Sequence, residues 1–312
     1  MNVMATAYTG NGPYCYSNSL HMCLTQAGME AVPPVSLLEC MTGMPFGASF
    51  LALDLPLFFP SPGAKTDPDR GLTRALETVG GECALRRFED AGAAEAGFRA
   101  ALAGGPVLLG PLDMGGLLYD PLHEHKRGGD HFVVALALEG DRVRLHDPQL
   151  YPFAVLPLPD LMDAWSAKGI AYAPAPYTLR CDFRATRPVP EPAMLARTLD
   201  TAREMAAGVP AGPVAFGGAR AFDRAAAVLR DRPPEPFTGM LVYFGLPLGA
   251  RRCADAAGFF ERIGKIEAAR RMAEKGEAYG EAQYHAARKD WARTADAFDR
   301  LARTESQFAA TL

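Results

Sequence analysis

Residues 130–148 read DHFVVALALEGDRVRLHDP, and this stretch decides the expected fold of the first half of the chain. The apolar run that follows His131 predicts a buried strand up to residue 138. After the turn EGDR, residues 143–148 predict a second strand that ends beside Asp147. The stretch is therefore expected to form a β-hairpin with His131 near its start and Asp147 near its end.

A hairpin brings these two residues close in space only if their side chains share a face. Successive side chains on a strand point to opposite faces, so the register decides whether the imidazole meets the carboxylate. A simple two-residue turn at Gly140 and Asp141 would place His131 and Asp147 on opposite faces. An interaction between them therefore requires an odd-length turn or a bulge.

A third residue, Cys15, lies in the stretch NGPYCYSNSL at 11–20. Pro13 suits the first turn of a helix, and residues 14–27 have helical spacing of apolar residues. The positive end of a helix dipole favours the thiolate, which is the attacking form of cysteine. Cys15, His131 and Asp147 thus match the order nucleophile, proton-transfer base and orienting acid.

Each of these residues also has a structural explanation by itself. A lone cysteine in a helix is most often a buried small residue. The sequence HDP after a strand is often a turn in which the aspartate bonds to nearby backbone, and His131 could be a core histidine. The three residues indicate a catalytic site only when they are taken together.

Composition narrows the classes of function. The chain has 312 residues, is 49% hydrophobic and carries a net charge of −4, which argues against a nucleic-acid-binding surface. The apolar runs are too short for a membrane span, and the N-terminus lacks the pattern of a signal peptide, so a cytoplasmic location is expected. The six cysteines form no CxxC pair. The three histidines in DPLHEHKRGGDH at 120–131 lie in a loop, so neither a metal nor another cofactor is expected.

The pattern predicts an α+β fold in two domains. The first domain, residues 1–186, has the cysteine helix and the hairpin, with a long loop at 111–129 between them. The proline-rich segment RPVPEP at 187–192 then opens an α-helical domain, residues 187–312. Helical periodicity there predicts helices near 192–207, 218–231, 249–273 and 276–309.

Several segments together resemble the papain-like superfamily of cysteine peptidases and transferases. The cysteine helix is followed by TGMPFGASF at 42–50, by PVLLGPLDMGGLLYDP at 106–121 and then by the His131–Asp147 hairpin. This layout, over about residues 8–180, is similar to the N-terminal domain of the butirosin-biosynthesis protein H family. The bacteriocin-leader peptidase domains of export systems share the order of Cys, His and Asp.

The resemblance implies a papain-like catalytic domain that moves an acyl group from a carrier-protein thioester through Cys15 to a small-molecule amine. The glutamine that peptidase members place before the cysteine is missing here, and Asn11 is the nearest amide that could donate to an oxyanion, beside the Cys15 backbone N–H. Tyr14, Phe46, Asp113 and Tyr119 lie in or beside the matching motifs and are the expected substrate-binding residues.

Two other functions fit the same residues. A cysteine peptidase or amidase would use water as the acceptor, and a binding module could keep the fold without activity. Residues 188–312 carry a net charge of +2, against −6 for residues 1–187. Arginines 230, 232, 251, 252, 270 and 271 are therefore expected either to steer an acidic acyl carrier protein or to pair with acids on their own helices.

Overall fold

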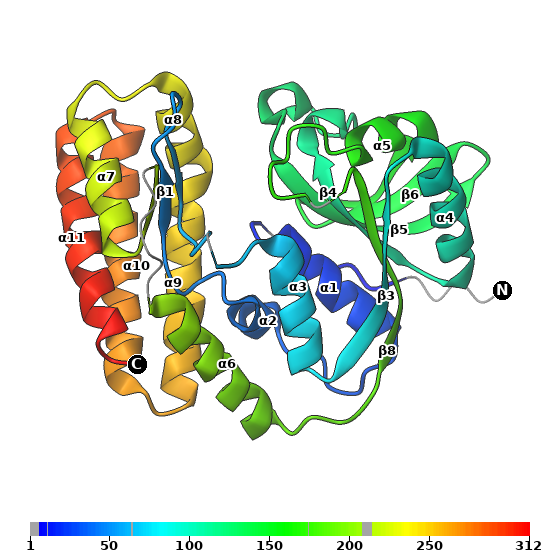
Figure 1. Ribbon diagram of the computed structural model, residues 1–312, viewed down its shortest axis with the longest axis horizontal. Coiled ribbons are helices and arrows are strands. Elements are labelled where there is room, and N and C mark those ends of the chain that lie inside the picture. Colours follow the sequence, from blue (N-terminus) through cyan, green and yellow to red (C-terminus); the bar gives the residue numbers. More distant parts are fainter. Residues whose placement is uncertain (1–5, 11, 64, 174, 208–213) are drawn as a thin grey trace. The chain divides into compact units, whose positions relative to one another are not determined.

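The computed structural model describes residues 6–10, 12–63, 65–173, 175–207 and 214–312. The chain divides into two compact units (Figure 1). The first unit consists of Met1–Val35 and Leu76–Val189, and the second consists of Ser36–Ala75 and Pro190–Leu312. The expected domains, 1–186 and 187–312, differ from these units chiefly in residues 36–75, which group with the C-terminal helices. The α+β class is confirmed, with sheets and helices in the N-terminal region and a helical bundle after it.

The first unit is built on an antiparallel sheet of six strands in the order β3-β8-β4-β5-β6-β7 (Figure 1). The strands are β3 (Gly81–Phe88), β4 (Val107–Asp113), β5 (Asp130–Glu139), β6 (Arg142–Asp147), β7 (Tyr151–Pro157) and β8 (Tyr177–Ala185). The helices are α1 (Cys15–Gln26), α4 (Ala91–Gly104) and α5 (Leu158–Trp165), with the short 3-10 helices η1 (Met114–Gly116) and η2 (His123–Lys126) in the loop after β4.

Helices cover both faces of this sheet. Val133 and Ala135 belong to one buried cluster with residues of α4 and α5, among them Phe98 and Trp165. The alternate residue Phe132 meets α1, since its ring lies edge-on to Tyr16 at 6.0 Å and its carbonyl accepts a hydrogen bond from Ser19. The unit therefore has three layers, with α1 on one face and α4 and α5 on the other.

The β5–β6 hairpin has the bulge that the sequence required. Leu138 pairs with Val143 and Glu139 with Arg142 around a two-residue turn, but the register shifts between Ala135 and Ala137. Beyond the shift, Val134 pairs with His146, so Val133 faces Asp147 across the two strands. The His131 imidazole, two residues before Val133, lies 2.7 Å from the Asp147 carboxylate. The extra residue therefore brings the imidazole and the carboxylate together, as the sequence required.

The second unit combines a helical bundle with a small sheet. Its helices are α2 (Val35–Thr42), α3 (Pro68–Thr78), α6 (Glu191–Ala206), α7 (Ala219–Arg230), α8 (Glu235–Met240), α9 (Leu246–Arg262), α10 (Ile266–Ala287) and α11 (Trp291–Ala309), with the π-helix η3 (Leu241–Gly245) between α8 and α9. The strands β1 (Ser49–Leu51), β2 (Leu57–Phe59) and β9 (Ala215–Gly217) form an antiparallel sheet in the order β2-β1-β9. Figure 1 shows α7, α9, α10 and α11 lying side by side.

The two long helices expected at 249–273 and 276–309 are wrong in their boundaries. Gly264 has a φ of 72° and ends α9, and Lys289 has a φ of 59° between α10 and α11. A left-handed residue cannot continue a right-handed helix, so each break follows from one backbone position. Hydrophobic periodicity runs across such breaks because both flanking helices face the same core.

Phenylalanine packing and two buried ion pairs hold the second unit together. Phe58, Phe222 and Phe298 pack at ring distances between 5.2 and 6.0 Å. Glu39 of α2 accepts a hydrogen bond of 2.9 Å from Arg252 of α9, and Lys275 pairs with Glu305, all four being buried. Among the described helices, none is both long and apolar enough to cross a membrane.

Candidate active site

Cys15 is the first residue of α1, directly after a strained turn. Tyr14, at the N-cap, has a φ of 71° and a ψ of 39°, which is a left-handed conformation that non-glycine residues rarely adopt. The buried Asn18 holds this turn, because its amide Nδ2 and its backbone N–H both donate to the Tyr14 carbonyl at 2.9 Å. The Cys15 side chain is partly exposed, whereas Cys23 in the same helix is buried. Strain of this kind is often found at functional positions.

His131 and Asp147 form a buried, hydrogen-bonded pair at one end of the sheet. His131 Nε2 lies 2.7 Å from Asp147 Oδ1, and the two side chains are 1% and 3% exposed. The other ring nitrogen, Nδ1, is also buried and makes no hydrogen bond with a described group. The ring is therefore fixed through Nε2.

Electrostatics links Cys15 to this pair. Burial by itself lowers the pKa of His131, but the charge of Asp147 and then that of a Cys15 thiolate outweigh it and raise the pKa to about 10. The hydrogen bond from His131 to Asp147 acts in the same direction. The pKa of Asp147 is lowered, because its charged partner His131 and the hydrogen bonds it accepts overcome burial. The His131 imidazolium and the Asp147 carboxylate therefore stabilise each other in this arrangement.

Three further groups fix the Asp147 carboxylate and its loop. The Tyr119 hydroxyl donates to Oδ2 at 2.9 Å, and the Gln149 backbone N–H donates to Oδ1 at 2.7 Å. The Tyr8 hydroxyl donates to the Asp147 carbonyl at 2.9 Å and accepts from the Leu150 N–H. Burial, together with the charge of Asp147, raises the pKa of Tyr119, so its hydroxyl remains a donor. Each acid oxygen thus has a protein donor.

A second layer of polar contacts supports Tyr119. Its ring lies edge-on to Tyr151 at 5.4 Å, and the Tyr151 hydroxyl donates to Asp120 at 3.1 Å. Lys126 donates to Asp120 at 2.6 Å and to Gln149 at 3.3 Å. This network orders the loop after β4, which the sequence indicated only as long and polar.

The structure assigns most of the expected substrate-binding residues to other contacts. Asn11 lies outside the described residues. Tyr14 is buried, and Asp113 accepts hydrogen bonds from the Gly115 and Gly128 N–H groups, which closes the loop around η1. Phe46 is fully buried in the second unit against Phe259 and Phe260, so it presents no surface to a substrate. Tyr119 donates a hydrogen bond to Asp147, as described above.

The other two histidines of this loop lie in the short helix η2. His123 Nδ1 lies 2.9 Å from the Gly115 carbonyl, and η2 holds both His123 and His125 at half-buried or exposed positions. Within the described part of the chain, no group of three or more histidine, cysteine or acidic side chains has the arrangement of a metal site. All six cysteines, which lie in that part, are free thiols.

The arginines of the second unit are largely paired with acids. Arg230 binds Asp296 and Asp299, and Arg251 binds Asp255. Both members of the 270–271 pair bind Glu267 and Glu274 on α10, while Arg252 is buried with Glu39. Neutralised in this way, these side chains offer little net positive charge to an acidic partner.

The family model that matches this chain covers its last hundred residues. Residues 212–312, which include α7 to α11, match the family model of the YobF C-terminal domain. The chain is also 35% identical over 168 residues to the uncharacterized protein YobF of Bacillus subtilis (strain 168). That match covers 53% of this chain and 52% of the relative, so the chain spans about half the length of the curated relative it matches. The matched family model does not extend to Cys15, His131 or Asp147.

Proposed function

We propose that the protein is a cysteine-dependent acyltransferase with a papain-like catalytic unit. One observation carries the proposal: His131 is held by Asp147 through Nε2 and influenced by Cys15, which begins a helix after a strained turn. A buried His–Asp pair beside a partly exposed helix-terminal thiol is the arrangement that nucleophilic catalysis by cysteine needs. The order of the three residues and the hairpin motif, similar to the butirosin-biosynthesis protein H family, further support it.

The proposed first step forms an acyl-enzyme. The Cys15 thiolate attacks the carbonyl carbon of a thioester donor, a new C–S bond forms, and the bond to the donor sulfur breaks. The His131 imidazolium gives its proton to the departing thiolate, which leaves as a free thiol. Backbone N–H groups at the start of α1, including that of Cys15, would donate to the oxyanion that forms on the way.

The second step transfers the acyl group to an amine. The acceptor nitrogen attacks the acyl carbon, the bond to Cys15 breaks, and His131 takes the proton that the nitrogen loses. Cys15 leaves as a thiolate and the imidazolium is restored, so the ion pair is ready for another cycle. Asp147 stays ionised throughout and stabilises the charged ring.

The donor is a thioester, and the resemblance favours one carried by an acyl carrier protein. The charge of the second unit adds little to this choice, because its clustered arginines are mostly paired. A small thioester such as an acyl-N-acetylcysteamine contains the reacting group without the carrier. It therefore tests the chemistry separately from the partner.

The test is to incubate the protein with acyl-N-acetylcysteamine thioesters and a series of small amines, and to measure amide and free acid by mass spectrometry. An amide that forms only with active Cys15 supports the transferase. If only free acid forms, at a rate independent of the amine, the protein is a hydrolase instead. If the protein consumes no thioester faster than the Cys15→Ala control does, both the transferase and the hydrolase are ruled out.

A further inference from the structure

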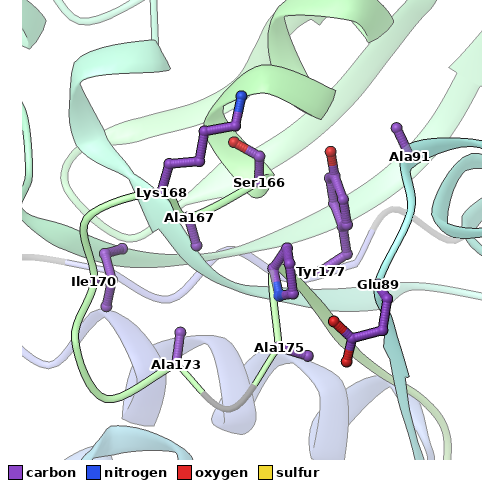
Figure 2. Close-up of a pocket in the computed structure, with 10 residues that line it drawn as sticks. Glu89, Ala91, Ser166, Ala167, Lys168, Ile170, Ala173, Ala175 and Tyr177 are labelled. Carbon is purple, nitrogen blue, oxygen red and sulfur yellow. The ribbon is translucent and has the colours of Figure 1, made fainter.

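The first unit has two features that the proposed reaction does not use. One is the cavity of Figure 2, between the end of β3 and the loop before β8, and neither Cys15, His131 nor Asp147 is among the residues that line it. The other is the segment of residues 6–10, here called the strap, which precedes Cys15 in the chain and contacts Asp147. Only the strap is bonded to a residue of the candidate active site.

The strap lies on the loop that follows Asp147. The Tyr8 hydroxyl donates to the Asp147 carbonyl at 2.9 Å and accepts from the Leu150 N–H at 3.0 Å. A Cβ atom at Gly10 would lie 2.5 Å from the Pro148 backbone and 2.6 Å from the Tyr8 hydroxyl oxygen, so a side chain does not fit there. Glycine therefore allows the backbone of the strap to approach the loop closely.

His146 joins the strap to β6 and β7. This buried side chain has Nε2 2.9 Å from the Thr6 carbonyl oxygen and Nδ1 3.1 Å from the Phe153 backbone nitrogen. Its ring lies edge-on to Tyr8 at 5.2 Å and to Phe153 at 4.6 Å. Three segments that are far apart in the chain therefore meet at one imidazole, directly before Asp147.

The two hydrogen-bond partners fix the protonation state of His146. A backbone N–H can only donate, so Nδ1 accepts the bond from Phe153 and has no proton. A carbonyl oxygen can only accept, so Nε2 has the proton and donates it to Thr6. The ring is therefore neutral, and a second proton, on Nδ1, would place two N–H donors opposite each other.

The groups around the ring do not favour a charged form. Burial raises the pKa of Tyr8 on the strap, so its hydroxyl stays neutral. Val134, which pairs with His146 from β5, and Phe153 on β7 are apolar. The carboxylate of the next residue, Asp147, is paired with the other histidine of the site. Burial lowers the pKa of His146, so the ring takes up a proton only in acid.

We infer that His146 is a positioning residue for Asp147. In its neutral form it holds the strap and β7 together, and the strap holds the Asp147 backbone through the Tyr8 hydroxyl. Acid that protonates the ring breaks the bond from Phe153 and loosens the strap, so the carboxylate is no longer fixed and acylation slows. The effect on acylation rests on the proposed function, whereas the attachment of the strap does not.

The first test reads the ring of His146 in the full-length protein by long-range ¹H–¹⁵N spectra, with His146→Asn to identify its signals. At neutral pH we expect the proton on Nε2 and none on Nδ1. In acid, below about pH 6.5, the amide signals of Phe153 and Leu150 should shift together with those of the ring. A proton on Nδ1 at neutral pH, or titration of the ring without a shift of the Leu150 amide, overturns the inference.

The second test measures acylation by a small thioester. His146→Ala should be about 10-fold slower at neutral pH, the effect of one lost buried hydrogen bond. His146→Asn should keep most of the rate, because its Oδ1 can accept from the Phe153 N–H. Since asparagine takes up no proton, this variant should also lose less of its rate in mild acid than the unchanged protein. Tyr8→Phe keeps the ring but not the hydroxyl and should already be about 10-fold slower at neutral pH.

His21→Gln is the matched control, because His21 Nδ1 lies 3.2 Å from the Thr9 hydroxyl of the same strap. A hydroxyl can donate or accept, so protonation of His21 keeps this bond. The control should therefore retain both the rate and its loss in acid. Equal rates for His146→Ala, Tyr8→Phe and the control, in variants that thermal melts show to be folded, overturn the positioning role. If the unchanged protein consumes no thioester, the proposed function fails, and the ring spectra still decide whether neutral His146 holds the strap.

Discussion

Replacing Asp147 by asparagine tests how the site keeps His131 charged. Asparagine preserves an acceptor oxygen and the size of the side chain, so the change removes mainly the negative charge. The bond from His131 Nε2 to Asp147 Oδ1 is 2.7 Å long and almost fully buried, so solvent and salt screen it weakly. Without the carboxylate, burial is the largest influence left on the ring, and it lowers the pKa of His131 from its raised value of about 10.

The expected fall in the pKa of His131 is about 1–3 units, the usual effect of one close opposite charge. A buried hydrogen bond to a charged group contributes about 1.5–3 kcal/mol. If this stabilisation is lost in the transition state, acylation of Cys15 slows by about 10- to 150-fold at neutral pH.

The assay is the rate of Cys15 acylation by a small thioester, measured by mass spectrometry at a series of pH values. The alkaline limb, which reports loss of the imidazolium proton, should move to lower pH in Asp147→Asn. Asp141→Asn, in the exposed turn of the same hairpin, is the control and should leave the profile unchanged. Identical rates and profiles for Asp147→Asn and the control would refute the role of the carboxylate.

Four further outcomes are expected. Tyr119→Phe removes a donor to the triad acid and should lower the acylation rate about 10-fold with little change in KM, measured by steady-state kinetics. The pKa of His131 is raised in the folded protein, so the charged ring stabilises the fold fully below pH 6.5 and this stabilisation is lost as pH rises through about 10. Tm should therefore fall over this pH range. A His131→Gln variant should lack this dependence of Tm on pH. In denaturant titrations, Lys275→Met should lower the free energy of unfolding by about 3–5 kcal/mol, because it leaves Glu305 buried and unpaired. Cys23→Ala should lower the free energy of unfolding by only about 1–3 kcal/mol and should leave acylation of Cys15 intact.

Local sequence rules predicted the elements that carry Cys15, His131 and Asp147. The hairpin, the helix that begins at Cys15 and the need for a bulge all followed from apolar patterning and side-chain alternation. The position of the bulge did not, because Ala135, Leu136 and Ala137 provide no special turn chemistry to mark it.

Long-range contacts explain what the sequence did not predict. Tyr8 bonds to Asp147, which lies 139 residues later in the chain, and no local sequence pattern predicts such a contact. The short strands at Ser49–Leu51 and Leu57–Phe59 lie in a proline-rich stretch and are stabilised by pairing with each other and with Ala215–Gly217. The four residues expected to bind substrate were chosen by their position in the motifs. Tyr14 and Phe46 are instead buried in the interior.

The most direct test of the central claim is intact-protein mass spectrometry after brief incubation with an acyl-N-acetylcysteamine thioester. We expect one added acyl group, which peptide mapping locates on Cys15, and its release as an amide when an amine acceptor is supplied. The adduct should be absent from Cys15→Ala and strongly reduced in His131→Ala, while Cys23→Ala should form it normally. An adduct on any other residue, or one that forms equally well without His131, would contradict the assignment of Cys15 and His131 as nucleophile and base.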